Sequence, residues 1–111
     1  MVLDAFQILP LDEPAGFRLI GELDIASLPM LEEALAGWEI SRPLTLEMSE
    51  LTFMDAGTAR LLLARAVAMN GAGPLVLDGP TGIPLRLMEV LRFREVMGIR
   101  IRSVREVTTD G

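Results

Sequence analysis

Four residue types that support much of enzyme chemistry are missing from this sequence: it has no histidine, cysteine, tyrosine or lysine, and all ten basic residues are arginine. Without histidine, the chain lacks the usual general base at neutral pH and the commonest metal ligand. Without cysteine or lysine, it can form no disulfide, zinc knuckle, Schiff base or P-loop. We therefore expect a protein that is not an enzyme and that holds no cofactor and no metal.

Basic charge is also scarce, since 16 acidic residues against 10 arginines give a net charge of −6. This balance argues against binding to nucleic acid or to an anionic membrane. Residues 1–55 carry eleven acids and two arginines, whereas residues 56–111 carry five acids and eight arginines. The C-terminal arginines either form a basic face for an acidic partner or lie on the solvated rims of a helix and an edge strand. The second reading is favoured for this set: Arg86, Arg92, Arg94, Arg100, Arg102 and Arg105.

No apolar run approaches the roughly 18 residues of a membrane span, and the N-terminus lacks the charged and apolar regions of a signal peptide. We expect a cytoplasmic protein that does not insert directly into a membrane. At 111 residues the chain fits one domain, 1–111, with a frayed tail at 106–111.

Hydrophobic patterning predicts an α/β fold with the element order ββαβαβαβ. The expected strands span 2–9, 17–23, 43–49, 73–78 and 99–102, and helices are expected to begin within 24–27, at 55 and at 81 or 82. The short Gly/Pro connection after the first strand predicts an antiparallel hairpin, and the later strand–helix–strand crossovers predict parallel neighbours. The inward side chains of the first and third helices are predicted to be Ile25, Leu28, Leu31, Leu35, Trp38, Leu85, Met88 and Leu91.

The handover from the third strand to the second helix is the strongest candidate for a functional site. Asp55 can accept hydrogen bonds from the backbone N–H groups of Gly57 or Thr58 and so cap the helix. Gly57 leaves one side of the first turn bare, which lets a flat partner approach closely. Thr58 places a hydroxyl near the positive end of the helix, where an added phosphate would be stabilised. The alternative is an ordinary capped helix with a packing glycine.

Two signatures about thirty residues apart identify a family resemblance. Gly-Glu-Leu-Asp at 21–24, followed after an apolar strand by Phe-Met-Asp at 53–55, resembles the STAS domain of bacterial anti-sigma factor antagonists. The resemblance runs from about residue 17 to residue 103 and includes the Asp-Gly-Pro-Thr turn at 78–81. It implies a mixed, mostly parallel sheet with helices wound as a βα superhelix, and a binding module. In such antagonists, a serine or threonine at the start of the second helix is phosphorylated by the anti-sigma factor, a serine kinase.

The sequence departs from this family pattern at the switch itself. Switched members typically read Asp-Ser-Ser-Gly or Asp-Ser-Thr-Gly, whereas this chain reads Asp55-Ala56-Gly57-Thr58. Either Thr58 is a displaced phosphoacceptor or the domain has lost phosphoregulation, and we favour the loss. The family's Thr-Gly-Leu after the third helix is also replaced here, by Leu-Arg-Phe at 91–93.

Two other parts of the sequence are candidate ligand sites. Asp55 and Asp78 are candidates for the ends of adjacent strands, where two carboxylates can hold Mg²⁺ in a receiver-like pocket. A receiver needs further acids at its first strand and a lysine, which this chain lacks. The glycine-containing segments 71–73 and 79–82 resemble phosphate loops only weakly, because Pro74 and Pro80 remove N–H donors, and turns are the favoured reading.

The preferred hypothesis is a regulatory module that binds an anti-sigma factor serine kinase, or another cytosolic regulatory protein, and frees a sigma factor without the usual switch. The alternatives are a non-switching STAS adaptor of a lipid or anion transport system or of a signalling scaffold, and a small carboxylate-based hydrolase. We expect a monomer or weak dimer. The expected partner-binding residues are Asp55, Ala56, Gly57, Thr58 and Arg60.

Overall fold

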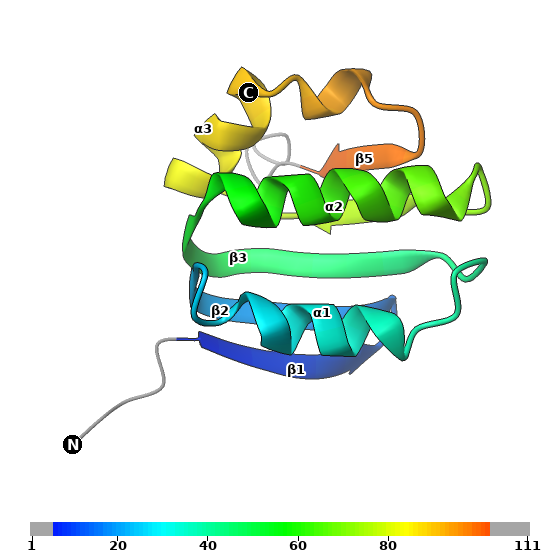
Figure 1. Ribbon diagram of the computed structural model, residues 1–111, viewed down its shortest axis with the longest axis horizontal. Helices are drawn as coiled ribbons and strands as arrows, with labels where there is room; N and C mark the ends of the chain where they lie inside the picture. The colour runs from blue at the N-terminus through cyan, green and yellow to red at the C-terminus, as the bar shows by residue number, and fades with distance from the viewer. Residues whose placement is uncertain (1–5, 103–111) are drawn as a thin grey trace, which may run out of the picture.

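The computed structural model describes residues 6–102, which build one five-stranded sheet and three α-helices (Figure 1). The elements are β1 (Phe6–Asp12), β2 (Ala15–Leu23), α1 (Leu28–Ala36), β3 (Leu44–Met54), α2 (Ala56–Met69), β4 (Leu75–Asp78), α3 (Gly82–Val90), a 3-10 turn η1 (Phe93–Glu95) and β5 (Ile99–Arg102). This succession confirms the predicted α/β fold and its ββαβαβαβ order. Residues 2–5 of the expected first strand and the tail 106–111 lie outside the described residues.

The strands lie in the sheet in the same order as in the chain, from β1 to β5. β1 and β2 form the predicted antiparallel hairpin, and the remaining neighbours are parallel. The expectation that the first strand stops at Pro10 is wrong, because β1 continues to Asp12 and pairs Pro10 with Phe17. Proline is tolerated there because β1 is an edge strand, where a missing N–H need not break the ladder.

β3 is much longer than predicted, with 11 residues that reach Met54 instead of stopping at Ser49. Its register against β2 shifts twice, between Arg18 and Ile20 and again between Gly21 and Glu22. These irregularities break the strict alternation on which the sequence prediction relied. They also bring the ends of β2 and β3 level, so that Leu23 pairs with Met54.

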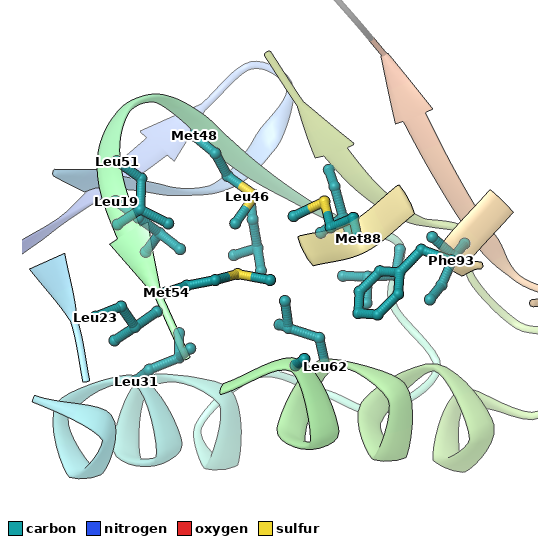
Figure 2. Close-up of a cluster of buried hydrophobic side chains, with 14 of the residues drawn as sticks. Leu19, Leu23, Leu31, Leu46, Met48, Leu51, Met54, Leu62, Met88 and Phe93 are labelled. Carbon is teal, nitrogen blue, oxygen red and sulfur yellow. The ribbon is translucent and has the colours of Figure 1, made fainter. Parts of the chain in front are cut away.

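The core lies between the sheet and the helices, with α1 and α2 side by side over one sheet face (Figure 1). Met54 of β3, Leu62 of α2 and Met88 of α3 are fully buried and meet in one cluster (Figure 2). Ala59 and Ala66 are also buried, and their small side chains let α2 sit close to the strands.

Two predicted core residues are in fact on the surface. Ile25 is 82% exposed because the helix begins only at Leu28, so Ile25 lies in the preceding turn. Leu91 is 41% exposed because it follows the end of α3. The buried side chain of this corner is instead Phe93 in η1, an element that the sequence analysis missed.

The sheet face that points away from the core carries a row of charged side chains. Arg18, Glu47, Asp78 and Arg102 occupy successive partner positions across β2, β3, β4 and β5. Arg18 Nε lies 3.4 Å from Glu47 Oε1, and Arg102 Nε lies 3.8 Å from Asp78 Oδ1. The carboxylate of Asp78 is thus paired with Arg102 on this outer face.

Candidate functional site

The carboxyl ends of β2 and β3 form the site, because the last paired residues of the two strands are direct neighbours. Asp24 follows β2 and Asp55 follows β3, so both turns start at the same edge of the sheet (Figure 1). The first turns of α1 and α2 also lie close together: a Cβ placed on Gly57 would be 3.9 Å from Leu28 Cδ2. Loops at this edge are where parallel sheets usually present functional groups.

Asp55 caps α2 as the sequence predicts. It has extended backbone geometry, and its Oδ1 accepts a 2.9 Å hydrogen bond from the Thr58 N–H. This bond satisfies one of the N–H groups that the first helical turn leaves without an intrahelical partner. The carboxylate therefore fixes the start of the helix.

Thr58 is fully buried, and its hydroxyl joins α2 to the end of β2. Thr58 Oγ1 lies 3.3 Å from the carbonyl oxygen of Leu23 and 3.1 Å from Oδ1 of Asp55. Both neighbours are acceptors, so the single hydroxyl proton is shared between them. The side chain faces the interior and takes no part in the molecular surface.

The first two residues of α2, Ala56 and Gly57, have little or no side chain, and Arg60 follows one turn later. Ala56 and Arg60 are exposed, and Gly57 is half-exposed. A Cβ on Gly57 would meet Asp55 Oδ1 at 3.5 Å and Leu28 Cδ2 at 3.9 Å, both ordinary contacts. At Ala56 and Gly57 the first turn of α2 has no protruding side chain, so another protein can approach its backbone closely.

Ile25, which the sequence predicted as a core residue, is an exposed side chain in the turn after β2, at the same edge of the sheet as the start of α2. Its turn is fixed by Asp24, whose Oδ1 accepts hydrogen bonds from the N–H groups of Ala26 (3.0 Å) and Ser27 (3.2 Å). The Ser27 hydroxyl adds a 3.0 Å bond to the Glu22 carbonyl. The signal was present in the sequence: Pro29 belongs in the first helical turn, which places Ile25 before the helix. We call Ile25, Ala56, Gly57 and Arg60 the α2-start patch.

The rival Mg²⁺ pocket is not assembled. The partner of Asp78 in β3 is Glu47, eight residues before Asp55, so the two carboxylates do not meet at one edge. The prediction had assumed that β3 and β4 end at the same level, whereas β3 runs on to Met54. Within residues 6–102, no group of three or more acidic side chains is placed to hold a metal ion.

Each of the two weak phosphate-loop candidates has an N–H group that bonds within the chain. The Gly79 N–H donates to the Arg102 carbonyl at 2.7 Å, and the Ala72 N–H donates to the Met69 carbonyl at 2.8 Å. These donors are therefore not free to bind a phosphate.

The corner after α3 keeps a left-handed turn although the family's glycine is replaced. Arg92 has φ 58° and ψ 44°, and Phe93 follows as a buried side chain. A non-glycine residue pays roughly 1–2 kcal/mol in this conformation, so the packing of Phe93 must outweigh that cost.

A comparison with protein-family models matches residues 11–101 to the family described as "Mlab, STAS domain". The chain belongs to the STAS domain family. The matched region contains both sequence signatures and the whole α2-start patch, and it confirms the resemblance to the STAS domain drawn from those signatures. No curated protein matches the chain closely enough to serve as a relative.

Membership of the STAS family makes this chain a regulatory or binding module of the kind that mediates protein–protein interactions. In the described part of the chain, no helix has both the length and the apolar character needed to cross a membrane.

Proposed function

We propose that this STAS domain binds a protein partner through the α2-start patch, and that phosphorylation does not control this binding. The observation that carries the proposal is the contrast between two neighbours. Gly57 presents bare backbone at the surface, whereas the hydroxyl of Thr58 is buried between two acceptors.

A phosphorylation switch needs a hydroxyl that a kinase can reach. Ala56 and Gly57, which occupy the usual acceptor positions, have none. A kinase could reach Thr58 only after both of its side-chain contacts were broken, and phosphoryl transfer depends strongly on positioning. The first turn of α2 therefore keeps one chemical state and is always available to a partner.

Two classes of partner fit a constant docking surface. The first is an anti-sigma factor of the serine-kinase type, which this domain would hold so that a sigma factor is released. The second is a transport or scaffold complex in which the domain is a fixed, non-catalytic adaptor. The buried Thr58 favours the second class, because adaptors need no release by phosphorylation. In either case we propose a cytoplasmic, non-enzymatic protein.

Gly57→Arg tests the docking surface. The added side chain covers the exposed backbone of the first turn of α2. It causes no backbone clash, since the nearest contact of its Cβ is an ordinary 3.5 Å. The wild-type protein is used as bait in cytosol from its own organism, captured proteins are identified by mass spectrometry, and the Kd of each is then measured. Gly57→Arg is expected to raise the Kd of the specific partner more than about tenfold, which corresponds to roughly 1.4 kcal/mol.

Gly37→Arg is the matched control, because a Cβ at Gly37 has its nearest contact at 3.8 Å and lies at the far end of α1. It should bind like wild type, and both variants should keep the wild-type circular dichroism spectrum. A Gly57→Arg protein that is folded and binds its partner with unchanged Kd would place the interface elsewhere.

A further inference from the structure

A second uncovered surface lies at the opposite end of α2, where two hollows of about 280 and 320 Å³ adjoin one side chain, Met97. The first is lined by Ala66, Val67, Asn70, Gly71, Val96 and Met97. The second is lined by Gly71, Gly73, Pro74, Met97, Gly98, Ile99 and Arg100. We call the two together the Met97 groove. Because α2 has 14 residues, this groove is about 20 Å from the α2-start patch.

The groove exposes apolar side chains and bare backbone. Val67 of α2 is 71% exposed, and Met97, in the turn between η1 and β5, is 87% exposed. Gly71 (φ +84°) and Gly98 (φ +92°) hold left-handed turns that suit glycine, and an added Cβ on Gly71 would meet nothing within 4 Å. The space beside Gly71 is therefore empty. Exposed apolar side chains next to such a space are typical of a surface that binds a partner.

The one charged side chain that lines the groove is basic, Arg100. Residues 56–77, which include α2 and the loop to β4, bring no acidic residue to the groove. Arg100 lines one hollow and Arg94 is exposed on the adjoining η1, while the nearby Glu95 is paired with Arg92 at 3.3 Å. The whole chain has a net charge of −6, so the basic groove differs in sign from the protein as a whole. Arg100 therefore favours an acidic ligand in the groove.

We propose that the Met97 groove docks an acidic amphipathic segment of a partner protein. Apolar side chains of the segment fill the hollows beside Val67 and Met97, and its carboxylates face Arg94 and Arg100. The unbranched thioether of Met97 adapts to the shape of the inserted side chain. An anionic membrane is a poorer fit, because the net charge of −6 opposes it and the surface is hollowed rather than convex.

This inference goes beyond the proposed function, since it concerns a different surface. Binding at the α2-start patch and binding at the Met97 groove can be combined in one partner or divided between two. Gly57→Arg is accordingly expected to leave binding at the groove unchanged.

The test uses the full chain and two synthetic helical peptides of about four turns. Both carry leucine along one face; the other face carries glutamate in the first peptide and arginine in the second. Binding is followed by fluorescence anisotropy and by the ¹³C-methyl NMR signal of Met97. The acidic peptide is expected to bind, to shift the Met97 methyl signal and to bind at least about tenfold more tightly than the basic one. Arg100→Gln should weaken it and reduce its salt dependence.

Val67→Glu is expected to raise the Kd of the acidic peptide at least about tenfold. Val90→Glu is the matched control, because Val90 is also helical and 70% exposed, and it should leave binding unchanged. The proposal is overturned if the acidic peptide does not bind, if both peptides bind equally, or if Val67→Glu binds like wild type. It is also overturned if the groove instead mediates self-association in sedimentation, or binds phosphatidylglycerol vesicles, in a manner that Val67→Glu abolishes.

Discussion

At the start of α2, one hydroxyl group accounts for much of the local structure. Thr58 Oγ1 reaches the carbonyl of Leu23, which lies 35 residues earlier in the chain, and so ties the helix to the end of β2. The family's usual glycine at this position has no side chain to make this link. Thr58 therefore adds a structural link at a position where the family has glycine, while Ala56 and Gly57 stand at the usual acceptor positions without a hydroxyl. This combination is why we propose a constant binding surface.

Asp55 is expected to stabilise the fold through its cap. Asp55→Ala removes the acceptor of both the N–H and the hydroxyl of Thr58. The loss should be about 1–2 kcal/mol, which lowers the melting temperature of a domain of this size by several degrees. Asp55→Asn retains an acceptor and should recover most of the stability. A melting temperature of Asp55→Ala equal to that of wild type would show that the cap contributes nothing.

The role of Asp55 was predictable from sequence, whereas the burial of Thr58 was not. An aspartate directly before an alanine-rich helical segment indicates a cap from local pattern alone. The position of Thr58 depends on the pairing of Leu23 with Met54, a contact between distant strands that includes two register shifts. Local periodicity carries no information about such shifts, so the inward direction of the hydroxyl emerged only from the fold.

Among the elements, α1 and α2 are joined by Arg65. This arginine of α2 donates from one terminal nitrogen to the Leu35 carbonyl at 2.8 Å and from the other to the Trp38 carbonyl at 2.9 Å. The Leu35 carbonyl lies in the last turn of α1 and the Trp38 carbonyl just beyond it, so the guanidinium acts as a cap supplied by the neighbouring helix. Burial lowers the pKa of Arg65 below its usual value, which is so high that the group stays charged at neutral pH.

Arg65→Met is expected to destabilise the domain by about 1–2 kcal/mol, because it leaves two carbonyls without this charged donor. Chemical denaturation measures the loss, and hydrogen exchange should show faster opening at the end of α1. Arg60→Met on the same helix is the control, since Arg60 is exposed and its change should stay within about 0.5 kcal/mol. Equal stabilities of the two variants would contradict the capping role.

Element order followed from the sequence because alternating strands and amphipathic helices have distinct periods. The lengths of the elements were predicted less accurately from the sequence than their order. β3 was predicted too short because its irregular register interrupts the alternation beyond Ser49. The turn η1 was missed because Arg92 takes a left-handed conformation that is ordinarily associated with glycine.

At the scale of the whole molecule, the two docking surfaces that we propose lie at opposite ends of α2. The α2-start patch lies at the carboxyl ends of β2 and β3, and the Met97 groove lies at the far end of α2. The composition indicated a basic C-terminal half, but only the fold shows which arginines border a hollow. Arg100 does, whereas Arg102 is paired with Asp78 on the outer sheet face.

The central claim, that the docking surface has no phosphorylation switch, is tested most directly by intact-mass measurement. The protein is incubated with MgATP and a serine-kinase anti-sigma factor, whose activity is verified on a family antagonist that reads Asp-Ser-Ser-Gly. A double variant, Ala56→Ser with Gly57→Ser, restores hydroxyls at the usual positions and serves as a second substrate. We predict that the wild-type mass does not change. A stoichiometric gain of about 80 Da, one phosphoryl group, that maps to Thr58 would contradict the account.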